Sequence, residues 1–181
     1  VHWRGLGGVL LGIGNLISKI YLTVIRGTPS TVQLLIIYFI LFGSSQNMVL
    51  AAIISFGVNS GAYVAEIVRS GIMSINKGQM EAGRSLGLNY AKTMQFIIIP
   101  QAIKNILPAL GNELITLLKE TSICTVIGLM DLTKGAMIVQ SRTYAPWMPY
   151  LSIAVIYLVM VMILTKLLGM LERRLRASDR R

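Results

Sequence analysis

Long apolar segments without charge dominate this chain, and short polar clusters separate them. Residues 27–65 contain no Asp, Glu, Lys or Arg. As a single helix this run would measure roughly 58 Å, about twice the hydrocarbon thickness of a bilayer. It must therefore hold two membrane spans, and the turn-forming cluster from Gly43 to Asn47 marks the break between them. A second charge-free run, residues 143–165, is long enough for one more span.

Residues 107–129 form an apolar segment of a different kind, because it carries charges. The pattern thus predicts four spans, near residues 28–43, 49–69, 107–129 and 147–168. Residues 5–18 are also free of charge, but they are short for a span and lack the cleavage pattern of a signal peptide. We expect an all-α fold, a polytopic membrane helical bundle with about four to five transmembrane helices, and one transmembrane domain over residues 1–181.

Composition agrees with a membrane protein. The mean hydropathy is +0.68, 54% of the residues are hydrophobic and only 13% are charged, which excludes an ordinary soluble domain. The net charge of +10 would suit nucleic acid only if a soluble domain presented it on one face, so we expect no nucleic-acid partner. The excess of positive charge on the cytoplasmic side of membrane proteins explains it better.

The four predicted spans place most of the positive charge on one side. The opposite side keeps Lys134 and Arg142, Arg69 lies at a span end and Lys119 lies within a span. We therefore assign both termini, the loop 70–106 and the basic tail 170–181 to the cytoplasm. The residues on that side are Arg4, Lys19, Arg26, Lys77, Arg84, Lys92, Lys104, Lys166, Arg173, Arg174, Arg176, Arg180 and Arg181.

The polar loop carries the most specific motif. It reads Glu81-Ala82-Gly83-Arg84-Ser85-Leu86-Gly87 and is followed by Ile97-Ile98-Ile99-Pro100. This spacing resembles the EAA loop of ABC-importer permeases, with Gly83 in place of the usual second alanine and Ile99 in place of the usual leucine. The resemblance implies short cytoplasmic helices that dock on a separate ATPase subunit, and coupling roles for Glu81, Ala82, Gly83, Gly87 and Pro100.

The residues of the loop support short helices independently. Glu81 lies near a predicted helix start, where a carboxylate complements the helix dipole, and Gly87-Leu88-Asn89 is typical of a helix-ending turn. A helix laid in a groove is a common recognition mode. The alternative is a solvated loop that only carries positive charge.

Three further segments extend the resemblance to about residues 13–175. They are Arg26-Gly27-Thr28-Pro29 with Gln33, Ser60 to Glu66, and Leu118 to Ser122, and they look like the polar amino-acid uptake branch, which includes histidine, glutamine and arginine permeases. The resemblance implies a type I ABC importer transmembrane fold, a second permease subunit that is identical or different, two ATPase subunits and an extracytoplasmic amino-acid-binding protein. Members usually carry five spans, so we expect this chain to be short of the family's first helix.

Polar side chains gather on one face of the span 107–129. On a helix they fall within an arc of about 120°, opposite Leu114 and Leu118. Ionisable groups cost roughly 2.5 kcal/mol or more each at mid-bilayer, so this face should meet a bundle interior or a water-filled path. For Lys119 and Glu120 a structural ion pair with a neighbouring helix is an equal alternative. The substrate-path candidates are Asn112, Glu113, Thr116, Lys119 and Glu120.

The sequence lacks the motifs of an enzyme. It contains no P-loop of the form Gly-x-x-x-x-Gly-Lys-Ser/Thr and no readable set of nucleophile, base and orienting group. Cys124 and His2 are the only residues of their types and give neither a disulfide nor a metal site. We therefore expect no catalytic or metal-binding residues and no cofactor on this chain, with ATP and magnesium in the partner ATPase.

Two other functions stay open at this point. The chain could be an ABC permease for another small solute. It could instead be an ATP-independent pore or a membrane scaffold, but either of these would leave the EAA-like spacing unexplained.

Overall fold

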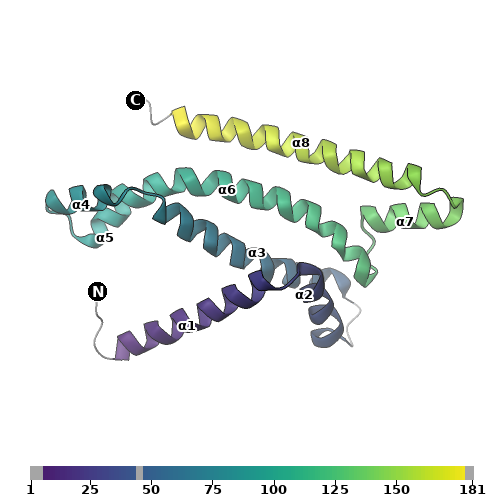
Figure 1. Cartoon of the computed structure of the whole chain (residues 1–181), viewed down its shortest axis with the longest axis horizontal. Coiled ribbons are helices and arrows are strands. Elements are labelled where there is room, and N and C mark those ends of the chain that lie inside the picture. Colours follow the sequence, from purple (N-terminus) through teal and green to yellow (C-terminus); the bar gives the residue numbers. More distant parts are fainter. Residues whose placement is uncertain (1–5, 44–46, 178–181) are drawn as a thin grey trace. The chain divides into compact units, whose positions relative to one another are not determined.

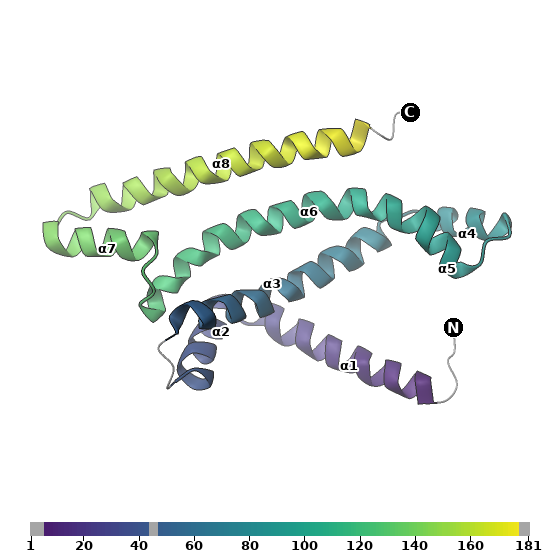
Figure 2. The same cartoon turned by 180° about the vertical axis from the view of Figure 1, so that it is seen from behind.

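A computed structural model describes residues 6–43 and 47–177, and every regular element in those ranges is a helix (Figures 1 and 2). The longer helices are α1 (Leu6–Gly27), α3 (Met48–Met73), α6 (Ile99–Glu120) and α8 (Trp147–Ala177). The shorter ones are α2 (Ser30–Ile36), α4 (Lys77–Ser85), α5 (Tyr90–Thr93) and α7 (Leu132–Thr143). Two segments are π-helical, η1 (Ile37–Leu41) and η2 (Met94–Ile98), and η3 (Thr121–Ile127) is a 3-10 helix. The all-α prediction is confirmed.

Some residues assigned to the cytoplasm from the sequence lie outside the described ranges. They are Arg4, Arg180 and Arg181. The same holds for His2 and for residues 44–46 of the predicted break, whose remaining members Gly43 and Asn47 are not helical.

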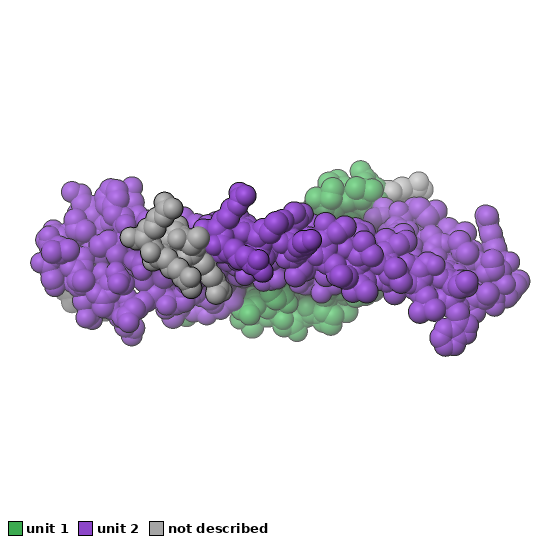
Figure 3. Space-filling model, turned by 90° about the horizontal axis from the view of Figure 1, so that it is seen from above, with its two compact units in different colours: residues 1–63 green, residues 64–181 purple. Residues whose placement is uncertain are grey.

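The chain forms two compact units, Val1–Tyr63 and Val64–Arg181, which Figure 3 shows in different colours. The boundary falls inside α3. The first unit contains α1, α2, η1 and the beginning of α3, and the second contains the remainder of the chain.

A buried hydrogen-bond network holds the first unit together at the break between α1 and α2. Pro29 has no N–H to give to the carbonyl of Ile25 one turn earlier, so that carbonyl loses its helical partner. The Gln33 amide replaces it: Nε2 donates to the Ile25 carbonyl at 2.7 Å and to the carbonyl and hydroxyl oxygens of Thr28 at 3.0 and 2.7 Å. The Thr28 hydroxyl in turn donates to the Val24 carbonyl at 2.8 Å.

The same network reaches α3. The Asn59 amide donates to Oε1 of Gln33 at 2.9 Å, and both side chains are buried, with exposed fractions of 4% and 7%. Two further contacts join α1 to α3: the Tyr21 hydroxyl donates to the Val58 carbonyl at 2.6 Å, and the Arg26 guanidinium lies 5.7 Å from the centre of the Tyr63 ring. The first unit is therefore closed by polar contacts rather than by a large apolar core.

In the second unit α6 and α8 run side by side, and α7 turns back along the beginning of α8 (Figures 1 and 2). α4 and α5 form a short hairpin that packs on η2, just before α6 begins. From Tyr90 to Ile127 the chain is one helical run, which passes through α5, η2, α6 and η3.

Two of the predicted spans match the structure and a third matches in part. Met48–Met73 and Trp147–Leu175 are long and apolar enough to cross a membrane, which confirms the spans at 49–69 and 147–168. The predicted span 107–129 belongs to the run Tyr90–Ile127, which qualifies as a span only together with Leu132–Thr143, at a bend of 50°.

The predicted span at 28–43 is wrong, and so is the expectation that the segment 5–18 is too short for a span. Ser30–Leu41 is a short apolar helical segment of about 18 Å, whereas Gly8–Gly27 forms a continuous apolar helix of 20 residues. Lys19 interrupts the charge-free residues of this helix, so the segment 5–18 looks too short for a span in the sequence. A lysine does not end a helix, and this helix ends only where Gly27, Thr28 and Pro29 provide a stop signal.

Most large apolar side chains remain exposed in the isolated chain. The most apolar 18-residue stretches of α1 and α8 contain no residue that is buried within the chain. Faces this large and apolar need lipid or another protein subunit to cover them. The chain belongs in a membrane and has several spans.

Replacing Gln33 by Leu should lower the free energy of unfolding by about 1–3 kcal/mol, because the Ile25 carbonyl and the Asn59 amide stay buried without their partner. Asn59→Leu should cost less, about 0.6 kcal/mol, because Gln33 keeps its bonds to the end of α1. The midpoint of unfolding in mixed micelles with a denaturing detergent measures both. Gln95→Leu makes the same change at an exposed position, so equal midpoints for Gln33→Leu and Gln95→Leu would contradict the role of the network.

Candidate functional site

The polar loop predicted from the sequence folds as the hairpin of α4 and α5. Asn76 begins α4, and its Oδ1 accepts from the Gly78 N–H at 2.8 Å. Ser74, just before this cap, accepts at Oγ from the Asn105 amide of α6 at 2.9 Å. The segment 74–76 that leads into the hairpin is thereby fixed both to α4 and to α6.

The tip of the hairpin is a well-formed helix-ending turn. Gly87 has φ of +84°, a left-handed conformation that glycine adopts without strain. The Leu88 N–H donates to the Gly83 carbonyl at 3.2 Å and the Gly87 N–H to the Arg84 carbonyl at 3.0 Å, which is the Schellman pattern. Asn89 then caps α5, accepting at Oδ1 from the Lys92 N–H at 2.9 Å. The predicted turn at Gly87-Leu88-Asn89 is confirmed.

Gly83 lies at the inside of the hairpin, where α4 meets α5 and η2. A Cβ atom at this position would lie 2.5 Å from Cγ2 of Thr93 and 2.8 Å from Cδ1 of Ile97. Thr93 is fully buried, and its hydroxyl donates to the Asn89 carbonyl at 3.0 Å. The departure from the family pattern at residue 83 therefore has a physical reason: the two helices approach too closely for an alanine opposite Thr93.

The outer surface of the hairpin is exposed and carries both charged and apolar side chains. Glu81, Ala82 and Gly87 lie on it, and so does Arg84. Leu86, at the tip, is 82% exposed, so an apolar side chain projects where nothing in this chain covers it. Tyr90 and Phe96 are also exposed, at 59% and 64%, and none of these three side chains is among the site residues predicted from the sequence.

Pro100 is separate from that surface and lies in the first turn of α6. Having no N–H, it gives nothing to the carbonyl of Phe96, and the turns just before it are wound as the π-helix η2. The predicted coupling residues thus divide: Glu81, Ala82 and Gly87 lie at the exposed surface, whereas Gly83 and Pro100 shape the backbone that presents it.

The polar face of α6 is also on the outside of the isolated chain. Asn112, Thr116 and Lys119 are exposed, and Glu113 and Glu120 are half-buried. The Thr116 hydroxyl donates to the Asn112 carbonyl at 3.1 Å, so it is satisfied within the helix.

Leu114, on the opposite face of α6, is 60% exposed. Burial within one chain therefore does not separate the polar face from the apolar face. The substrate path along Asn112, Glu113, Thr116, Lys119 and Glu120 stays a prediction.

The segment Leu118 to Ser122 is where α6 tightens into η3. The Thr121 hydroxyl donates to the Leu118 carbonyl and the Ser122 hydroxyl to the Lys119 carbonyl, each at 2.7 Å. Both hydroxyls thus bond to carbonyls of the preceding turn. Within the described ranges, three or more His, Cys, Asp or Glu side chains are nowhere grouped so as to hold a metal ion.

Comparison with known proteins identifies close relatives over almost all of the chain. The family model described as binding-protein-dependent transport system inner membrane component matches residues 6–177. The chain is 45% identical to the arginine transport system permease protein ArtQ of Bacillus subtilis, covering 90% of this chain and 76% of the relative. It is 38% identical to the glutamine transport system permease protein GlnP of Escherichia coli K12, covering 91% and 77%.

Solved structures agree with this family. The crystal structure of an amino acid ABC transporter with histidines superposes with a TM-score of 0.83 at 53% identity, covering 88% of this chain and 75% of that chain. An inward-facing structure of the MetNI methionine ABC transporter superposes with a TM-score of 0.72 at 18% identity, covering 91% and 76%, and shows the shared fold alone.

The close approach at Gly83 makes a specific prediction. Gly83→Ala should gain about 1 kcal/mol of helix propensity but lose about 1–3 kcal/mol to overpacking against Thr93, so we expect net destabilisation. Adding Thr93→Ser removes the Cγ2 atom, keeps the hydroxyl and should restore most of the loss. Thermal unfolding in detergent measures both variants.

The matched control is Gly135→Ala in α7, where a Cβ atom meets nothing within 4 Å. It should be neutral or stabilising. If Thr93→Ser failed to rescue Gly83→Ala, the steric account of this glycine would be wrong.

Proposed function

This chain belongs to the family of binding-protein-dependent transport system inner membrane components, and we propose that it is the permease of an ATP-driven importer for polar amino acids. The observation that carries the proposal is the match of residues 6–177 to the family, together with relatives named as arginine and glutamine permeases at 38–45% identity. Arginine and glutamine share an α-amino acid group and a polar side chain. We propose that the substrate belongs to this class.

Coupling to ATP is proposed to take place at the α4–α5 hairpin. Its tip offers Leu86 as an apolar anchor, and the charged residues Glu81 and Arg84 of α4 are exposed on the same hairpin. An apolar anchor with a polar rim is the usual composition of a protein-binding surface. ATP and magnesium would be bound by ATPase subunits, since this sequence contains no P-loop.

We propose that the hairpin and both ends of the chain lie in the cytoplasm. With α1, α3, the bent pair Tyr90–Ile127 with Leu132–Thr143, and α8 as four crossings, these parts share one side of the membrane. This topology places Arg26 at the extracytoplasmic end of α1, whereas the sequence analysis assigns it to the cytoplasm. The hairpin and the chain ends still carry most of the positive charge, as the cytoplasmic side should.

The path itself is proposed to form between subunits. One chain with about four spans is too small to enclose a solute path, and its polar face on α6 is exposed. A second permease, identical or different, would cover that face. An extracytoplasmic binding protein would deliver the amino acid, and ATP-driven approach of the hairpins would alternate access to the cavity.

The coupling proposal predicts that Leu86→Asp abolishes most transport while the chain still inserts and folds, because the residue is 82% exposed and contributes little to packing. Burying an unpaired carboxylate at the ATPase contact should weaken the complex at least tenfold. Copurification of the ATPase subunits, and ATP-dependent amino-acid uptake in proteoliposomes with the binding protein, provide the measurements.

Leu86→Met is the matched control and should behave like the parent. Full uptake by Leu86→Asp would overturn the hairpin as the coupling site. Uptake by vesicles that contain this chain alone, without nucleotide, would instead favour an ATP-independent pore.

The path proposal predicts a difference between the two faces of α6 in the assembled importer. In a Cys124→Ala background, cysteine at 112 or 116 should react with a water-soluble maleimide, and the rate should change with nucleotide, because this face would line a water-filled cavity. Cysteine at 114 should react poorly, since lipid or protein would cover it. Equal reactivity at 112 and 114 would refute the assignment of faces.

A further inference from the structure

α8 is too long for the hydrocarbon core of a bilayer. Its 31 residues measure about 46 Å, against roughly 30 Å of hydrocarbon. The charge-free run 143–165 accounts for the apolar part, so the surplus lies at the C-terminal end and begins at Lys166. The last three turns or so of α8 are therefore at the level of the lipid headgroups.

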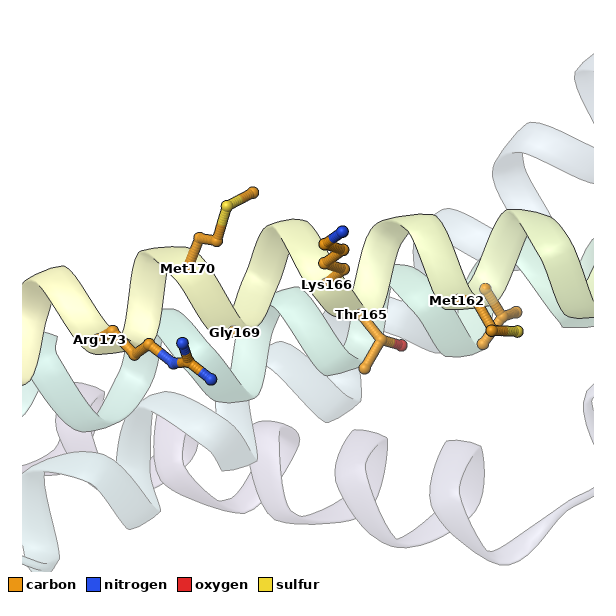
Figure 4. A pocket seen from close by; sticks show the side chains of 7 residues that line it. Met162, Thr165, Lys166, Gly169, Met170 and Arg173 are labelled. Atoms are coloured by element: carbon orange, nitrogen blue, oxygen red, sulfur yellow. The ribbon is translucent and has the colours of Figure 1, made fainter.

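An open cavity of about 640 Å³ lies along one face of this end of α8, and all the residues that line it belong to this helix. Lys166 and Arg173 lie within about 20° of each other around the helix and about 10.5 Å apart along it. Gly169 lies between them, and a Cβ atom there would meet nothing within 4 Å (Figure 4). The residues that line the cavity are Val161, Met162, Thr165, Lys166, Gly169, Met170 and Arg173.

The chemistry of this cavity changes along the helix. Val161 and Met162 form an apolar wall on the side of the hydrocarbon, whereas Lys166 and Arg173 bring two exposed cations to the side of the headgroups. Thr165 adds a hydroxyl beside the hollow at Gly169. Glu172, the carboxylate on this part of α8, is about 100° around the helix from Arg173.

We propose that this cavity binds an anionic phospholipid, with its phosphate over Gly169 between Lys166 and Arg173 and its acyl chains along Val161 and Met162. Lysine and arginine are the usual partners of phosphate, and an arginine can hold it with two parallel bonds. The apolar wall selects a lipid over a soluble phosphate. Two cations at one headgroup select an anionic lipid over a zwitterionic one.

The test uses the full chain assembled with its partner subunits in detergent, titrated with phosphatidylglycerol and followed by native mass spectrometry. Lys166→Gln and Arg173→Gln should each weaken the tightest lipid-binding step about fivefold. Gly169→Leu should weaken it at least as much without any loss of charge, because the new side chain fills the hollow. The open space at Gly169 lets this variant fold.

Arg174→Gln is the matched control, because it removes the same charge one residue further along and about 100° around the helix. It should leave the tight step unchanged. Equal weakening by Arg173→Gln and Arg174→Gln would show diffuse attraction and overturn the site. Displacement of the lipid by inorganic phosphate, or equal binding of phosphatidylcholine, would overturn it as well.

Discussion

Backbone groups freed at a helix break need new partners, and within hydrocarbon only the chain itself can provide them. Each break described here, in the spans and in the exposed hairpin alike, is closed by a side chain or by a turn motif. Gln33 replaces the N–H that Pro29 lacks, Asn89 and the left-handed Gly87 close the hairpin tip, and Asp131 caps α7 by accepting from the Lys134 N–H at 2.7 Å. The arrangement of helices in each unit follows from where these closures occur.

Local signals in the sequence predict this structure well where they act over a few residues. The turn at Gly87-Leu88-Asn89 and the helices around Met48–Met73 and Trp147–Leu175 follow from glycine, capping residues and hydropathy. Contacts between distant residues could not be predicted in this way. Gln33 and Asn59 are far apart in the sequence, and a charged residue, Lys19, concealed the continuity of α1.

The candidate site, too, could be predicted only where local signals act. The sequence located the hairpin, but only the structure separates its exposed residues from Gly83, which is buried against Thr93. Leu86 stood within the motif unnoticed, because its importance lies in being uncovered rather than in its type. The proposed role of the polar face of α6 depends on a second permease subunit, so neither the sequence nor the fold of one chain decides what that face meets.

The continuous helical run from Tyr90 to Ile127 connects the hairpin to the polar face of α6. From Tyr90 to Thr116 it extends about 39 Å, so a tilt of about 5° at the hairpin would move the polar face by roughly 3 Å. The close approach of Gly83 to Thr93 holds α4 against the beginning of this run, so the two would move together. In the proposed importer this run would act as a lever that carries a motion of the hairpin to the polar face of α6.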